Sequence, residues 1–170
     1  LTVGDVFVEN GYRTALVGKA HFQPTRTSDE YHSLESMPLL QDIEFWKSYN
    51  QPFYGFEKIE LLRNHTNEFL VGQHYAAWLE EKGFHDWKQY YMAPTGTMDP
   101  GIKYTWGIPE EYHYNTYIAE KTNEILEAYQ RQGENFLLWA SFPDPHPPYL
   151  VPEPWASMYD PADMELGTLE

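Results

Sequence analysis

The spacing of apolar side chains along the chain predicts helices in four places. The clearest pattern begins at Pro109, which suits a first helical turn, and its apolar residues keep to one face until Gly133. The helix dipole favours the charges at both ends, with Glu110 and Glu111 at the start and Arg131 near the finish. The predicted helices span residues 1–10, 38–49, 68–82 and 109–132.

Short apolar runs between these helices predict three strands. Residues 136–140 read Phe-Leu-Leu-Trp-Ala, a continuous apolar run that is typical of a strand covered on both faces. Runs at residues 13–17 and 56–62 predict two further strands, while residues 84–108 have the Gly and Pro content of an ordered loop region. A helix followed directly by a buried strand indicates an α/β fold.

The composition adds a constraint on ligands. Aromatic residues make up 17% of the 170 residues, which excludes a disordered chain and favours large buried or ligand-facing rings. Lys and Arg number 11 against 26 Asp and Glu, a formal charge of −15, so nucleic acid and anionic membranes are poor partners. An anionic substrate would therefore have to be bound by a few local cations.

The residue types also limit which chemistry a site in these residues can have. The sequence has no Cys, which excludes disulfides, a Cys nucleophile and Cys-ligated zinc within these residues. It has no run of 18 apolar residues, so no membrane span is expected. The sequence starts at Leu1 without an initiator Met and stops at Glu170 without a clear finish. Both ends are therefore expected to be cut from a longer protein. The compartment is not indicated.

The first candidate for chemistry is the loop that follows the predicted strand at residues 13–17. Ligands of open α/β sheets bind at the carboxyl ends of strands, and Lys19 supplies a compact charge there that suits a tetrahedral oxyanion. His21 lies two residues on, so in extended chain it shares a face with Lys19 and can hold or transfer a proton. The alternative is a surface Lys beside a core-packed His.

The second candidate is the loop after residues 136–140, where His146 stands among four prolines within residues 143–148. Proline locks the backbone, which would aim the imidazole at a fixed point, although an incidental His in a Pro-rich turn fits equally well. Asp144 could fix the tautomer of His146 or cap a turn, and the turn is favoured.

The other rings and histidines have mainly structural interpretations. His74 and His85 lie in or beside a helical, aromatic setting and are predicted to be structural, and no pattern surrounds His32, His65 or His113. Four aromatic residues could stack against sugar rings, but a core or an oligomer interface is favoured for them. These are Tyr90, Tyr91, Tyr104 and Trp106.

Residues 11–22, Gly-Tyr-Arg-Thr-Ala-Leu-Val-Gly-Lys-Ala-His-Phe, closely resemble the second sulfatase signature, GYxTxxxGKxH. Residues 136–149 are similar to the strand and loop that bring a substrate-binding His to the same site in that family. Residues 54–57 and 152–161 resemble its intervening and following segments. The resemblance implies that residues 1–170 form a partial sulfatase catalytic domain. Its α/β fold would be part of the mixed, helix-flanked sheet of the alkaline-phosphatase superfamily.

The resemblance also implies a mechanism. In that family a Cys of a CxPxR motif becomes formylglycine, whose hydrate attacks sulfur while a divalent cation, usually calcium, neutralises charge. By matching position, Lys19 would bind sulfate and nucleophile oxygens, and His21 would hydrogen-bond the formylglycine hydroxyl. His146 would hold a sulfate oxygen near the leaving group. The substrate would be a sulfated small molecule or carbohydrate.

Several of the family's motifs are missing from these residues. They include CxPxR, an early Asp pair, a later Asp-Asn or Asp-His motif and a second Lys, so the resemblance implies that the formylglycine and metal ligands lie outside this chain. A Ser nucleophile also fits, and the isolated chain is expected to be inactive. Two alternatives remain open: a phosphonate monoester or phosphodiester hydrolase of the same superfamily, and a non-catalytic carbohydrate- or anion-binding module. A homo-oligomer also remains open, because cut sheets expose edges that associate.

Overall fold

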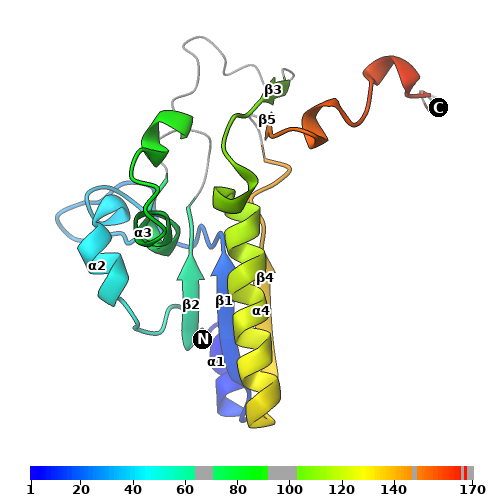
Figure 1. Cartoon of the computed structure of the whole chain (residues 1–170). Coiled ribbons are helices and arrows are strands. Elements are labelled where there is room, and N and C mark those ends of the chain that lie inside the picture. Colours follow the sequence, from blue (N-terminus) through cyan, green and yellow to red (C-terminus); the bar gives the residue numbers. More distant parts are fainter. Residues whose placement is uncertain (64–70, 92–102, 147–148, 166, 168–170) are drawn as a thin grey trace.

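The computed structural model describes residues 1–63, 71–91, 103–146, 149–165 and 167 (Figure 1). The helices are α1 (Val3–Glu9), α2 (Ile43–Ser48), α3 (Gln73–Glu81) and α4 (Tyr114–Gln132). The strands are β1 (Arg13–Gly18), β2 (Lys58–Leu61), β3 (Lys103–Thr105), β4 (Phe136–Ser141) and β5 (Tyr149–Val151). Short 3-10 turns include Leu39–Gln41, Trp87–Tyr91, Glu110–Tyr112 and Trp155–Ser157.

The main sheet has the strand order β2-β1-β4, and all three strands are parallel (Figure 1). Gly18 at the end of β1 pairs with Leu61 of β2 and with Ser141 of β4. The carboxyl ends of the three strands are therefore level, and the loops that leave them start from one edge. This arrangement confirms the predicted α/β fold.

The core lies on both faces of β1, whose residues 14–18 are all buried. Side chains alternate along a strand, so Ala15 and Val17 pack against the side of α3 and α4, while Leu16 packs against Trp46 of α2 and its neighbours. The central strand of the described sheet is thus β1, and its buried end is the point from which the Lys19 loop starts.

The strand β4 departs from the prediction. Phe136 and Trp139 are 40% and 41% exposed, so the strand is not covered on both faces within the described residues. Its described neighbour in the sheet is β1, on one side, and α1 is only 7 residues long. A continuous apolar run therefore predicted a strand correctly but not its burial, which depends on elements distant in the sequence.

The helix boundaries differ from the prediction in physically simple ways. The chain makes a 3-10 turn after Pro109, and α4 begins only at Tyr114, with His113 as its N-cap. Gly133 closes α4 in the left-handed conformation, as predicted. The helix predicted over residues 68–82 is shorter, because Val71 and Gly72 are not helical and its predicted start lies outside the described residues.

The aromatic residues of the predicted loop region mostly build the core. Tyr91 and Trp106 are buried, and the Tyr91 hydroxyl lies 2.6 Å from that of Tyr75, which donates a bond of 2.7 Å to the Tyr112 carbonyl. Tyr90 packs partly buried against the same cluster, and the side chain of Tyr104 lies outside the described residues. Among the described rings, burial supports the core interpretation over sugar stacking.

Candidate functional site

The candidate site is the sheet edge where β1, β2 and β4 end (Figure 1). Lys19 follows β1 directly, Arg63 lies two residues after β2, and β4 leads into the loop that carries Asp144 and His146. Because the strands are parallel and adjacent, residues far apart in sequence start from neighbouring positions on this edge.

Lys19 is held at this edge by its own backbone. Its N–H donates to the Ser141 carbonyl over 3.0 Å, which continues the β1–β4 ladder past the end of β1. Gly18 has a φ of +104°, and a Cβ there would lie 2.0 Å from the Ser141 carbonyl oxygen. The glycine before the lysine is therefore required by the close approach of β4 and by its backbone conformation.

The Lys19 ammonium is half-buried beside two charged groups. Burial lowers its pKa, the positive charge of Arg63 lowers it further, and the carboxylate of Glu35 opposes both effects. A lysine in this setting gains most from an added negative charge, which is what an oxyanion ligand would supply.

The chain bends sharply at His21, and this corrects one prediction. His21 has a φ of +54°, so it does not continue an extended strand from Lys19, and its side chain is exposed. The bend follows from Glu35, a buried carboxylate that accepts 2.7 Å bonds from the N–H groups of His21 and Gln23. The prediction of an extended chain from Lys19 to His21 is therefore wrong, because a carboxylate distant in the sequence shapes this loop.

Arg63 is a functional candidate that the sequence patterns did not single out. Its side chain is 4% exposed, one terminal nitrogen donates to the carbonyl of Glu35, and its Nε has no hydrogen-bond partner among the described residues. Burial lowers its pKa, opposed by the charge of Glu35. Its place in the sequence could have marked it as a candidate, since Arg63 follows the end of β2 much as Lys19 follows the end of β1.

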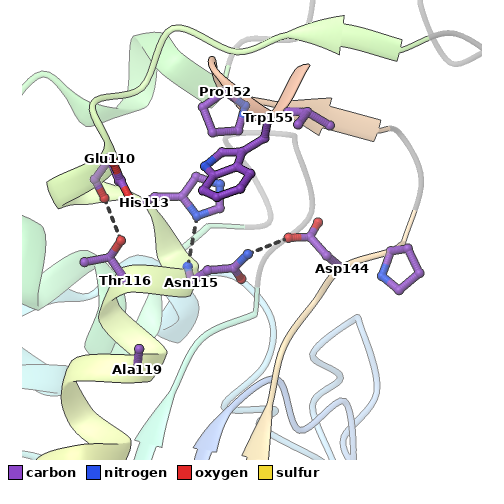
Figure 2. Close-up of a pocket in the computed structure, with 10 residues that line it drawn as sticks. Glu110, His113, Asn115, Thr116, Ala119, Asp144, Pro152 and Trp155 are labelled. Carbon is purple, nitrogen blue, oxygen red and sulfur yellow. Dashed lines mark hydrogen bonds between the residues drawn. The ribbon is translucent and has the colours of Figure 1, made fainter. Parts of the chain in front are cut away.

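The loop that carries His146 is tied to the start of α4. One carboxylate oxygen of Asp144 accepts from the Tyr114 hydroxyl over 2.8 Å. The other accepts from Asn115 Nδ2 over 2.9 Å (Figure 2). The N–H of His146 donates to the Pro143 carbonyl over 3.1 Å, which closes a turn, and the imidazole is exposed. Asp144 thus anchors the loop to a helix, a role that neither sequence alternative described.

His113 organises the helix end that receives Asp144. Its Nδ1 accepts a 3.0 Å bond from the Asn115 N–H, so the neutral ring carries its proton on Nε2 (Figure 2). Burial lowers its pKa to about 4, against the opposing charge of Asp144. The burial of Tyr114 raises the pKa of its hydroxyl, and the negative charge of Asp144 raises it further, so Tyr114 stays a hydroxyl donor. His113 was missed because N-capping by His has no strong sequence signal.

A cavity of about 630 Å³ lies between the start of α4 and the segment after β4. His113, Asn115 and Asp144 line it on one side, and Pro152 and the half-exposed Trp155 line it on the other (Figure 2). A molecule bound there would lie beside the loop that carries His146.

Two other histidines were predicted to be structural, and the packing of His74 agrees with that prediction. The Leu61 N–H donates to Nδ1 of the partly buried His74 over 3.1 Å, and His74 Nε2 lies 3.1 Å from the Tyr49 carbonyl. Burial lowers the pKa of His74. His85 pairs with Glu80 at the surface. The structure thus brings the loops of Lys19, His21 and His146 to one edge, whereas His74 bonds the backbone of β2 and His85 lies at the surface.

The described residues do not fit a metal ion or a Cys-derived group. They contain no cluster of three or more His, Asp or Glu that could hold a metal, and the sequence has no Cys. None of the described helices has the length and apolar character that a bilayer crossing requires.

A comparison with known protein families gives one further finding. Residues 1–168 match the family model described as Sulfatase.

Proposed function

The chain belongs to the sulfatase family, and we propose that it is part of a catalytic domain that hydrolyses sulfate esters. The observation that carries the proposal is the pairing of Gly18 with Ser141, which starts the Lys19 loop and the His146 loop from adjacent positions. Two short loops that leave one position can supply charges to a single tetrahedral group.

In this proposal Lys19 binds the sulfate oxygens of the substrate. Its ammonium is half-buried near a second cation, so an approaching sulfate relieves a local excess of positive charge. The ammonium would also stabilise the negative charge that develops on sulfate oxygens as the ester bond breaks. Lys19 is therefore assigned to binding and to charge stabilisation.

The two imidazoles are assigned to hydrogen bonding and proton transfer. His21 would hold or move a proton at the nucleophile, and His146 would hold a sulfate oxygen near the leaving group. Both side chains are exposed in the described structure, so a substrate can reach them. The anchoring of the second loop by Asp144 supports a fixed position for His146.

Sulfatases generally use a metal ion and a formylglycine, and they act on sulfated substrates. Because the described residues do not fit either group, the proposal places both in other parts of the protein and assigns this chain only binding and proton transfer. The isolated chain 1–170 is accordingly expected to be inactive. It should also self-associate in size-exclusion chromatography, since β4 and α1 expose apolar side chains such as Trp139 and Val3.

The test is an assay of the intact protein with aryl sulfate, aryl phosphodiester and phosphonate monoester substrates. Sulfate release by the wild type, lost in Lys19→Met and His146→Asn, would support the proposal. Lys47→Met is the matched control, because this exposed lysine pairs with Glu44 away from the sheet edge. Turnover of the phosphorus esters without sulfate release would favour the phosphonate hydrolase alternative, and no turnover would favour a binding module.

A further inference from the structure

A second cavity opens beside the Lys19 loop, near the end of β2. Its volume is about 420 Å³, and its wall is formed by residues 25–27 and 35–37 together with Leu40 and Arg63. Apart from Leu40 and Met37, the wall residues have polar side chains. Sequence patterns did not mark this cavity, because its wall comes from three separate segments.

The charge balance of the cavity wall is positive. Arg26 and Arg63 line it, against the single carboxylate of Glu35. That carboxylate is already engaged, since its two oxygens accept bonds of 2.7 Å from backbone N–H groups of the His21 loop. A chain with a formal charge of −15 thus keeps two guanidinium groups at one small cavity.

Arg63 is the wall residue that most needs a ligand. It is 4% exposed, and its Nε has no hydrogen-bond partner among the described residues. A buried charged donor without an acceptor is costly, whereas a guanidinium that meets an oxyanion forms short, charge-assisted hydrogen bonds. The hydroxyls of Thr27 and Ser36 on the same wall are hydrogen-bonded to each other over 2.7 Å, so at most one of their two hydrogens is left to donate to a ligand.

We propose that this cavity is a subsite for a second oxyanion of the substrate, a sulfate or carboxylate group other than the ester that is cleaved. The proposal rests on the proposed function, because the subsite serves the same substrate. Glu35 joins the two regions, since its carboxylate holds the His21 backbone and its carbonyl accepts from Arg63. The substrate class is therefore a dianionic ester, such as a sugar with a second sulfate or a carboxylate.

Equilibrium dialysis of the intact protein with radiolabelled inorganic sulfate tests the subsite without requiring turnover. The wild type should bind two sulfates, Lys19→Met one, and Arg63→Met one. Loss of a charge-assisted hydrogen bond should weaken the second site by about tenfold or more. Arg131→Met is the matched control and should still bind two, because that arginine is exposed on α4 and pairs with Glu127.

A second variant tests the same cavity in case Arg63→Met does not fold. Met37 is 46% exposed on the cavity wall, so Met37→Glu adds a carboxylate without disturbing a buried group, and it should also weaken one sulfate site. Acetate should compete at this site, and the tighter of acetate and sulfate identifies the oxyanion.

The outcomes separate the subsite from the proposed function. Two sulfates bound unchanged by Arg63→Met, or unchanged by Met37→Glu, would overturn the subsite. A single wild-type site that Lys19→Met abolishes would overturn it as well and leave the sulfatase proposal intact. Two sites that survive Lys19→Met would contradict the role of Lys19, while loss of one in Arg63→Met would still support the subsite.

Discussion

The loops after β1 and β4 leave the sheet from paired residues but are held in different ways. The first follows the buried central strand, and buried Glu35 clamps its backbone through two N–H groups. The second follows a half-exposed strand, and Asp144, at the surface, ties it to α4 through two side-chain hydrogen bonds. Backbone clamping from inside should set a position more firmly than side-chain bonds at the surface.

One edge of the sheet thus combines a lysine whose loop is held from the core with a histidine whose loop is held by a surface anchor. Lys19 is set by the core, so damage to its loop should cost folding stability. His146 is set by a surface anchor, so damage there should cost activity with little change in stability. Substitutions that weaken each loop separately test that contrast.

Gly18→Ala should be the most damaging change. The added Cβ would meet the Ser141 carbonyl oxygen, and alanine is strained at a φ of +104°. We expect a loss of about 3 kcal/mol or more in the free energy of unfolding, measured by urea denaturation. Gly107→Ala, whose Cβ would meet no atom within 4 Å, is the control and should change little.

Glu35→Gln should loosen the first loop while keeping its size. An amide has one acceptor oxygen in place of two, so one of the two clamped N–H groups loses its partner. Unfolding should become easier by about 2 kcal/mol, and kcat/KM of the intact protein should fall. An unchanged stability, equal to that of the exposed Glu44→Gln control, would contradict the clamp.

His113 should make stability depend on pH. Its folded pKa of about 4 lies below the usual value of 6.5, so the unfolded chain takes up a proton first as the pH falls. Stability should be highest above pH 6.5 and should decline by about 2 kcal/mol from pH 7 to pH 5 through this group. Urea denaturation of His113→Asn should show a smaller decline, with His74 adding a contribution of the same sign.

Asp144→Asn should act mainly on activity. The amide keeps one acceptor, so one of the bonds from Tyr114 and Asn115 is lost and the His146 loop is less well placed. We expect kcat/KM for an aryl sulfate to fall by about tenfold, with the melting temperature nearly unchanged. Tyr114→Phe removes one bond and should give part of the effect. If Asp144→Asn and Tyr114→Phe instead lower the melting temperature by the same amount, the anchor has a purely structural role.

Much of this arrangement was predictable from local sequence. The strand predicted at residues 13–17, the helix that Gly133 ends and the α/β order follow from patterns that span a few residues. The exposure of β4, the bend at His21 and the burial of Arg63 did not follow, because each depends on a partner distant in the sequence. Glu35 illustrates the limit, since it lies in an irregular polar stretch that carries no recognisable motif.

A crystal structure of the intact protein with bound sulfate would show whether the two loops meet at one ligand. We expect one sulfate with Lys19 Nζ and an imidazole nitrogen of His146 each within about 3 Å of its oxygens. A sulfate that meets only one of these groups, with the other turned to a different face of the protein, would contradict it.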